Sequence, residues 1–170
     1  FHGDRQRRSP QTLNWNPVMV EKQGFKHFML KEIYEQPGVV RTCLETYLHE
    51  DWQPEQTQSP IRLELPQALY TDLDRIHILA CGTSWHASLV GKYLLEQVAG
   101  VPTEVHYASE FRYAPSPLTP NTLTIGVTQS GETADTLAAL ELEKKRRSDC
   151  SDAYRARLLG ITNRTESSLG

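Results

Sequence analysis

The chain has 170 residues, enough for one ordinary domain or for one domain with a short appendage. Its 18 Lys and Arg against 21 Asp and Glu give a formal charge of −3, whereas a dedicated nucleic-acid binder carries a basic excess. Hydrophobic residues make up 38 % of the chain, which suffices for a core, and no apolar run approaches the roughly 20 residues of a membrane span. We therefore expect a soluble protein that binds neither nucleic acid nor a membrane.

The start and end of the chain predict a piece of a longer protein. Residues 1–24 are polar, Arg-rich and interrupted by two prolines, with one candidate short strand at 13–16, and the chain begins without Met and stops at Gly170 with no closing element. We expect residues 1–24 to be a linker or the end of a preceding domain. Three cysteines, an odd number without metal-type spacing, predict a reduced, cytoplasmic protein.

Helical spacing of apolar residues begins at Phe25 and runs to Ile33, and a second one-sided stripe lies between residues 40 and 48. Pro37 separates the two stripes and predicts the end of one helix and the beginning of the next. We expect residues 25–60 to form a helical lead-in that packs on a later sheet or on a partner chain.

Short apolar runs then alternate with helical segments. The spacing predicts strands at 76–80, 101–107, 122–127 and 157–162, and helices that end near residues 100, 113 and 147. Gly100 is the expected stop of the first of these helices. This alternation predicts an α/β fold over residues 61–170, a three-layer αβα domain with a mostly parallel sheet.

Two loops rich in small hydroxyl residues follow strands and precede helices, at residues 81–84 and 128–133. Ligands of open α/β sheets bind at the carboxyl ends of the strands, and a helix N-terminus offers unpaired N–H groups and about half a positive charge. The sequence contains neither a P-loop motif nor G-x-G-x-x-G. The two loops therefore predict a site for a small phosphorylated metabolite; the alternative is that their Ser and Thr residues only cap helices.

Other polar residues are not expected to form a site. Residues 144–147 are a basic run in the last turn of a helix, where cations offset the helix dipole and lie in water. His86 is expected to pack or cap, and Glu132 could act as an acid or base only if it pointed at a ligand. No metal site is expected, because three histidines lack ligands at metal-type spacing: His27, His77 and His106.

Residues 80–84 (ACGTS) and 129–133 (QSGET) resemble the two phosphosugar-binding loops of sugar isomerase (SIS) domains, which are flavodoxin-like. Residues 26–37 (KHFMLKEIYEQP) are similar to the start of the isomerase part in the glutamine–fructose-6-phosphate aminotransferase family, and the similarity runs from about residue 14 to the end. It implies a linker plus the first of two SIS subdomains, in an enzyme that also has a glutaminase domain and is expected to be a homodimer. It implies no cofactor.

The resemblance also implies the binding residues. Six residues are placed on the sugar phosphate, fructose 6-phosphate or glucosamine 6-phosphate: Thr83, Ser84, Thr128, Gln129, Ser130 and Thr133. The family usually has Ser where Thr128 stands and Tyr where Trp85 stands. The acid–base groups for moving a proton between C1 and C2 are implied to lie outside this chain, so the catalytic residues stay unknown and the chain alone is expected to be inactive.

Two alternatives stay open. SIS domains also occur in sugar-responsive regulators, which would carry a DNA-binding helix-turn-helix before the SIS domain, whereas residues 1–24 lack helical periodicity. A stand-alone sugar-phosphate isomerase is the other alternative, and residues 26–37 count against it.

Overall fold

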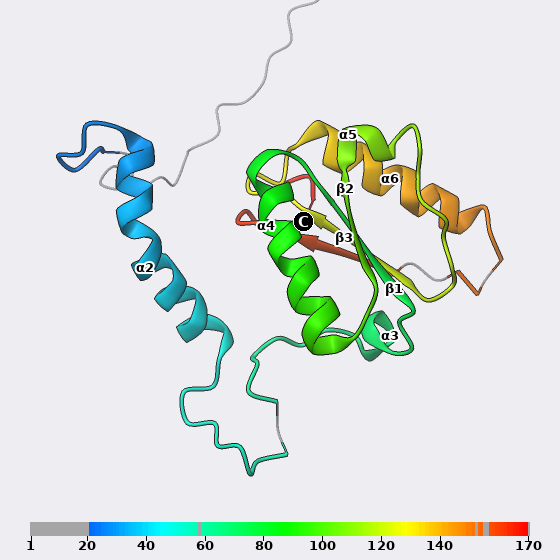
Figure 1. Ribbon diagram of the computed structural model, residues 1–170, viewed down its shortest axis with the longest axis horizontal. Coiled ribbons are helices and arrows are strands. Elements are labelled where there is room, and N and C mark those ends of the chain that lie inside the picture. Colours follow the sequence, from blue (N-terminus) through cyan, green and yellow to red (C-terminus); the bar gives the residue numbers. More distant parts are fainter. Residues whose placement is uncertain (1–20, 58, 152, 155–156, 170) are drawn as a thin grey trace, which may run out of the picture. The chain divides into compact units, whose positions relative to one another are not determined.

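The computed structural model describes residues 21–57, 59–151, 153–154 and 157–169 (Figure 1). The chain divides into two compact units, Phe1–Glu64 and Leu65–Gly170. The predicted strand at 13–16 and all but the last four residues of the expected linker lie outside the described residues. No helix of the described part is both long and apolar enough to cross a membrane.

The first unit contains one long helix, α2 (Phe28–Tyr47), which runs straight through Pro37. The prediction of two helices separated at Pro37 was therefore wrong. Pro37 removes one N–H from the hydrogen-bond ladder without ending α2. After α2 the chain forms an isolated antiparallel bridge between Leu48 and Ile61.

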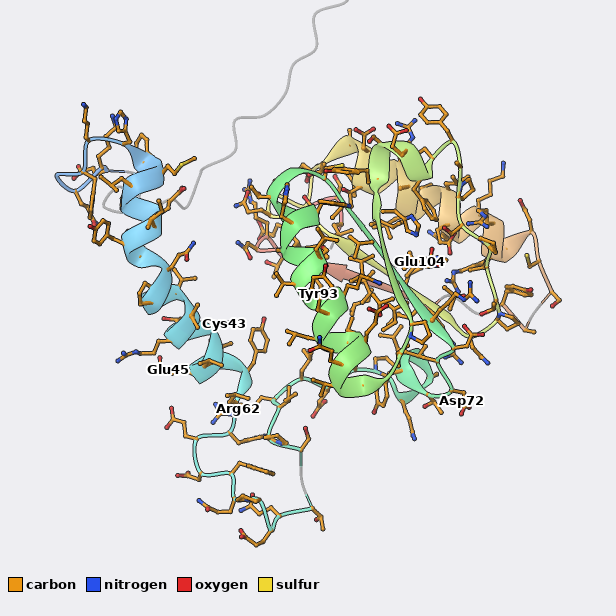
Figure 2. All side chains as sticks on the ribbon, in the orientation of Figure 1. Cys43, Glu45, Arg62, Asp72, Tyr93 and Glu104 are labelled. Carbon is orange, nitrogen blue, oxygen red and sulfur yellow. The ribbon has the colours of Figure 1, made fainter. Side chains whose placement is uncertain are left out.

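Most apolar side chains of α2 are left uncovered by the first unit itself. Cys43 (labelled in Figure 2) is also exposed on this helix. Lys31 is the buried exception, and its Nζ donates to the carbonyl of Glu21 (2.8 Å) and pairs with Glu35 (3.5 Å). The exposed apolar residues of α2 include Phe28, Met29, Ile33, Tyr34, Val39, Val40, Leu44 and Tyr47.

The second unit is built around a four-stranded sheet of order β2-β1-β3-β4 in which every neighbouring pair is parallel. In chain order its elements are α3 (Gln67–Tyr70), β1 (Arg75–Ala80), α4 (Gly82–Leu94), the π-helical segment η1 (Leu95–Ala99), β2 (Thr103–Tyr107), α5 (Ala108–Phe111), β3 (Thr122–Val127), α6 (Ala134–Ser148) and β4 (Leu158–Ile161). The predicted strand–helix alternation is confirmed, and so is the helix stop at Gly100, where φ is +68°. Neither α3 nor the π-helical segment was predicted.

Helices cover both faces of the sheet, with α4 on one face and α5 and α6 on the other (Figure 1). Side chains of a strand alternate between the faces, so β1 supplies residues to both cores, and β3 supplies Leu123 and Ile125 to the core on the α4 side. The core on the α4 side contains Ile76, Ile78, Leu123 and Ile125. The core on the α5–α6 side contains Leu79, Ala108, Phe111 and Ala139. The three-layer αβα fold predicted from the sequence is confirmed.

The face under α6 also buries an ionic network. The Glu143 carboxylate is fully buried and accepts hydrogen bonds from Thr124 Oγ1 (3.0 Å), Arg146 Nη1 (2.8 Å) and Arg147 Nη2 (3.2 Å). Arg147 also donates to the carbonyl of Thr122 (2.9 Å). Lys144 and Lys145 are exposed as predicted, but the expectation that the whole run 144–147 lies in water was wrong. Two of its cations turn towards the sheet because a buried carboxylate is there to pair with them.

Candidate functional site

The two hydroxyl-rich loops leave the sheet at adjacent points. Ala80, the last residue of β1, is the register partner of Val127, the last residue of β3. In the sheet, β2 lies next to β1 on one side, whereas β3 and then β4 follow on the other side of β1. The carboxyl ends of β1 and β3 therefore form a topological switch point, the place where open α/β sheets bind ligands.

The first loop leads directly into α4. Cys81 is extended (φ −131°, ψ 154°), Gly82 has φ +57°, and the helix begins at Gly82. Thr83 is exposed and Ser84 half-buried, so both are accessible in the first turn. Among the described residues no side chain caps this helix, and its first N–H groups are therefore available to a ligand.

The second loop holds two hydroxyl groups against each other. Thr128 is buried, and its Oγ1 lies 2.6 Å from Oγ1 of Thr133, the residue before α6. Whichever hydroxyl donates in this pair, the other keeps its hydrogen for a further acceptor. Ser130 Oγ accepts from the N–H of Glu132 (3.1 Å), and Gln129 is exposed. Within the described part α6 has no side-chain cap either, so simple helix capping does not account for these hydroxyls.

The segment after β4 packs on the second loop. Gly131 has φ +70°, and a Cβ at this position would overlap the side chain of Ser167. The carboxylate of Glu132 accepts from Ser168 N–H (2.8 Å) and Ser168 Oγ (2.7 Å). These hydrogen bonds lower the pKa of Glu132 and hold its carboxylate towards residues 162–169. Glu132 is therefore a structural anchor of the loop. No local sequence signal reveals this contact, because 36 residues separate Glu132 from Ser168.

An aromatic stack borders the first loop. Trp85, in the first turn of α4, stacks on Tyr107 at the carboxyl end of β2, with ring centroids 4.3 Å apart and planes inclined by 9°. His86 Nδ1 lies 3.0 Å from the carbonyl of Gly82, in the same turn. The stack fixes the start of α4 to the end of β2. The sequence did not suggest Tyr107 for this role.

A hollow of the described surface lies away from the two loops. It has a volume of about 260 Å³ and lies between α6 and β4, lined among others by Leu140, Leu158 and Leu169. None of its lining residues belongs to either loop. This hollow is therefore separate from the two loops.

The sequence of residues 69–170 matches the SIS domain family. The chain belongs to the SIS domain family. This SIS domain contains both candidate loops, and its preceding helix α2 lies outside the matched range.

The similarity to longer proteins extends over the whole chain. It is 72 % identical over 170 residues to the glutamine–fructose-6-phosphate aminotransferase of Thermosynechococcus vestitus, covering 100 % of this chain and 27 % of the relative. The corresponding protein of Nostoc is 68 % identical, with coverage of 99 % and 27 %. The chain thus spans about a quarter of the length of these curated relatives, and the resemblance found from the residues is confirmed.

A solved structure has the same fold. The C-terminal domain of glucosamine-fructose-6-phosphate aminotransferase from Francisella tularensis matches with a TM-score of 0.69 and 36 % identity, covering 88 % of this chain and 38 % of that domain.

Proposed function

We propose that this chain is the phosphosugar-binding part of the isomerase portion of a glutamine–fructose-6-phosphate aminotransferase. One observation carries the proposal: the register of Ala80 with Val127 sets two hydroxyl-rich helix starts side by side at the switch point of the sheet. The similarity to aminotransferases includes residues 21–64, before the SIS domain, which favours this function over a regulator or a stand-alone isomerase.

The loops would hold the phosphate by backbone and hydroxyl donors without a cation. The uncapped N-termini of α4 and α6 supply N–H groups and partial positive charge. Thr83 and Ser84 would donate from the first loop, and Gln129, Ser130 and the Thr128–Thr133 pair from the second. Glu132 carries a negative charge near the proposed anion site. Hydrogen bonds from Ser168 hold that carboxylate in place.

The whole enzyme would transfer ammonia from glutamine to fructose 6-phosphate and isomerise the adduct to glucosamine 6-phosphate. Proton transfer between C1 and C2 needs a positioned acid and base. We propose that a second SIS subdomain, a glutaminase domain and a partner subunit of a cytoplasmic homodimer supply the groups that this chain does not. The chain alone would then bind sugar phosphate weakly and catalyse nothing.

Calorimetric titration of the chain with fructose 6-phosphate and glucosamine 6-phosphate tests the site. We expect weak saturable binding of both, and at least about tenfold weaker binding in Ser130→Ala and Thr133→Val, since each loses hydrogen bonds to a charged group worth roughly 1.5–3 kcal/mol. Ser148→Ala is the matched control, because this hydroxyl lies at the other end of α6 and bonds only to its own helix, at Lys145.

Three results would contradict the proposal: no saturable binding by the unaltered chain, unchanged affinity in Ser130→Ala and Thr133→Val, or equal weakening in the Ser148→Ala control. Formation of glucosamine 6-phosphate by the chain alone would contradict its expected inactivity.

A further inference from the structure

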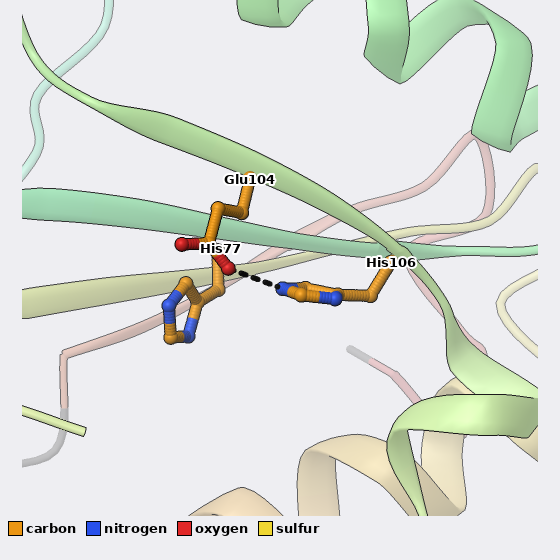
Figure 3. A group of neighbouring side chains, drawn as sticks. All are labelled: His77, Glu104 and His106. Atoms are coloured by element: carbon orange, nitrogen blue, oxygen red, sulfur yellow. Dashed lines mark ion pairs between the residues drawn. The ribbon is translucent and has the colours of Figure 1, made fainter. Parts of the chain in front are cut away.

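A second group of polar side chains lies on the sheet face under α5 and α6, below the strand ends. His77 is the register partner of Glu104 across β1 and β2, and His106 follows Glu104 by two residues on the same strand. All three side chains therefore point to one face of the sheet (Figure 3). One ligand atom from each of them lies within 4.8 Å of the other two.

His77 is the unusual member of this group. Its side chain is fully buried, yet neither ring nitrogen has a hydrogen-bond partner among the described residues. Buried polar groups are nearly always paired, and an exception calls for an explanation. The ring packs edge-on to His106 and Phe111, with centroids 5.4 and 6.3 Å away, so packing explains its position but leaves both nitrogens unused. A neutral imidazole carries a lone pair on one of its two nitrogens, so His77 offers a ligand atom that no described residue uses.

Glu104 and His106 complete the group and open it to solvent. Glu104 Oε2 lies 3.3 Å from His106 Nε2, and Ser116 Oγ approaches the same two atoms at 3.1 and 3.3 Å. The Glu104 side chain is about half exposed (51 %), on the edge strand β2 (labelled in Figure 2). A solvent molecule can therefore reach the group from the Glu104 side, whereas His77 closes it from the interior.

The charges around the group limit how strongly it can hold a cation. Arg146 donates to the carbonyl of Ser116, and Arg146 and Arg147 share the single carboxylate of Glu143. The Arg146 guanidinium, which reaches the carbonyl of Ser116, places positive charge near the group, while Glu104 supplies one negative charge to attract a cation. We therefore expect moderate affinity.

We propose that His77, Glu104 and His106 form a binding site for a divalent first-row transition metal of the Zn²⁺ type, with water as the fourth ligand. Two imidazole nitrogens and one carboxylate oxygen suit Zn²⁺, whereas Mg²⁺ prefers oxygen ligands alone. Tetrahedral ligands at the usual zinc distances lie about 3.4 Å apart, so small side-chain rotations would close the site. The bound ion would link the edge strand β2 to the central strand β1. This metal site does not depend on the proposed phosphosugar function.

The test is a titration of the tag-free chain with Co²⁺ followed by visible absorption, then displacement by Zn²⁺. We expect one equivalent of Co²⁺ to give a tetrahedral d–d spectrum without a sulfur-to-cobalt charge-transfer band, and Mg²⁺ not to displace it. Glu104→Gln and His106→Gln should weaken Co²⁺ binding by at least about tenfold. The exposed His27 provides the control variant His27→Gln, which should bind like the unaltered chain.

Glu104→Gln still tests the metal site if variants at the buried positions fail to fold, because the Glu104 side chain is half exposed. Circular dichroism of each variant shows whether the fold is kept. Absence of a one-equivalent tetrahedral spectrum would overturn the proposal, as would full binding in Glu104→Gln, a thiolate charge-transfer band, or equal loss in His27→Gln.

Discussion

The buried Glu143–Arg147 pair allows a sharp prediction about what holds α6 on the sheet. Glu143→Leu leaves the Arg147 guanidinium without its carboxylate, and Arg147→Met leaves a fully buried carboxylate with less compensation. Burial lowers the pKa of Arg147, as expected where the surroundings disfavour an unpaired charge. Since α6 begins at the second loop, its docking also positions the candidate site.

The expected size follows from the partners that each change removes. Glu143 accepts from Thr124, Arg146 and Arg147, and Arg147 also supports a backbone carbonyl of β3. Removing one member of a buried ion pair costs about 3–5 kcal/mol. Domains of this size have a free energy of unfolding of roughly 5–15 kcal/mol, so each single variant should lose a large part of its stability. The double variant Glu143→Leu/Arg147→Met leaves neither charge of the pair and should be markedly more stable than either single variant.

Urea denaturation followed by far-ultraviolet circular dichroism measures all four proteins of this double-mutant cycle. Glu141 and Lys145 provide the matched control, with the same spacing on the exposed face of α6. Glu141→Leu and Lys145→Met should leave the urea midpoint nearly unchanged, because exposed pairs contribute little. Losses below about 1 kcal/mol in the single variants, or strictly additive losses in the double variant, would refute the reasoning.

Two further predictions concern backbone packing and pH. Gly126→Ala should destabilise the chain by about 1–3 kcal/mol, because the new Cβ would overlap the side chain of Leu140 in α6. Gly91→Ala should stabilise it by roughly 0.5–1 kcal/mol, because Gly91 lies inside α4 with open space around it. Thermal unfolding of the two variants checks the opposite signs. The pKa of Glu132 is lowered by the hydrogen bonds from Ser168, so this contact is fully present above the ordinary carboxyl pKa of 4.5 and is lost as pH falls through the lower folded value. Protection of the Ser168 amide against exchange, measured relative to the rate of an unprotected amide at the same pH, should fall in that acid range, and this fall should be absent in Glu132→Gln; an identical pH profile in both proteins would contradict the assignment.

Local patterns were sufficient for most elements of the SIS domain, and they failed at Pro37 and at Arg147. Each β-strand was predicted because its apolar run is short and bounded by turn residues. The prediction that Pro37 separates two helices was wrong, because Pro37 removes one N–H of the ladder without ending α2. The prediction that Arg147 lies in water was wrong because its partner Thr122 lies 25 residues earlier, on another element.

Length and charge predicted one folded domain that binds neither nucleic acid nor a membrane, and the loop sequences at 81–84 and 128–133 predicted a site for a small phosphorylated metabolite. Those conclusions rest on local order: which residues follow a strand and precede a helix. Strand register is a different matter, because it depends on how segments far apart in the chain align. Only the tertiary structure could set Ala80 beside Val127, direct Glu132 to Ser168, and bring His77 to Glu104 and His106.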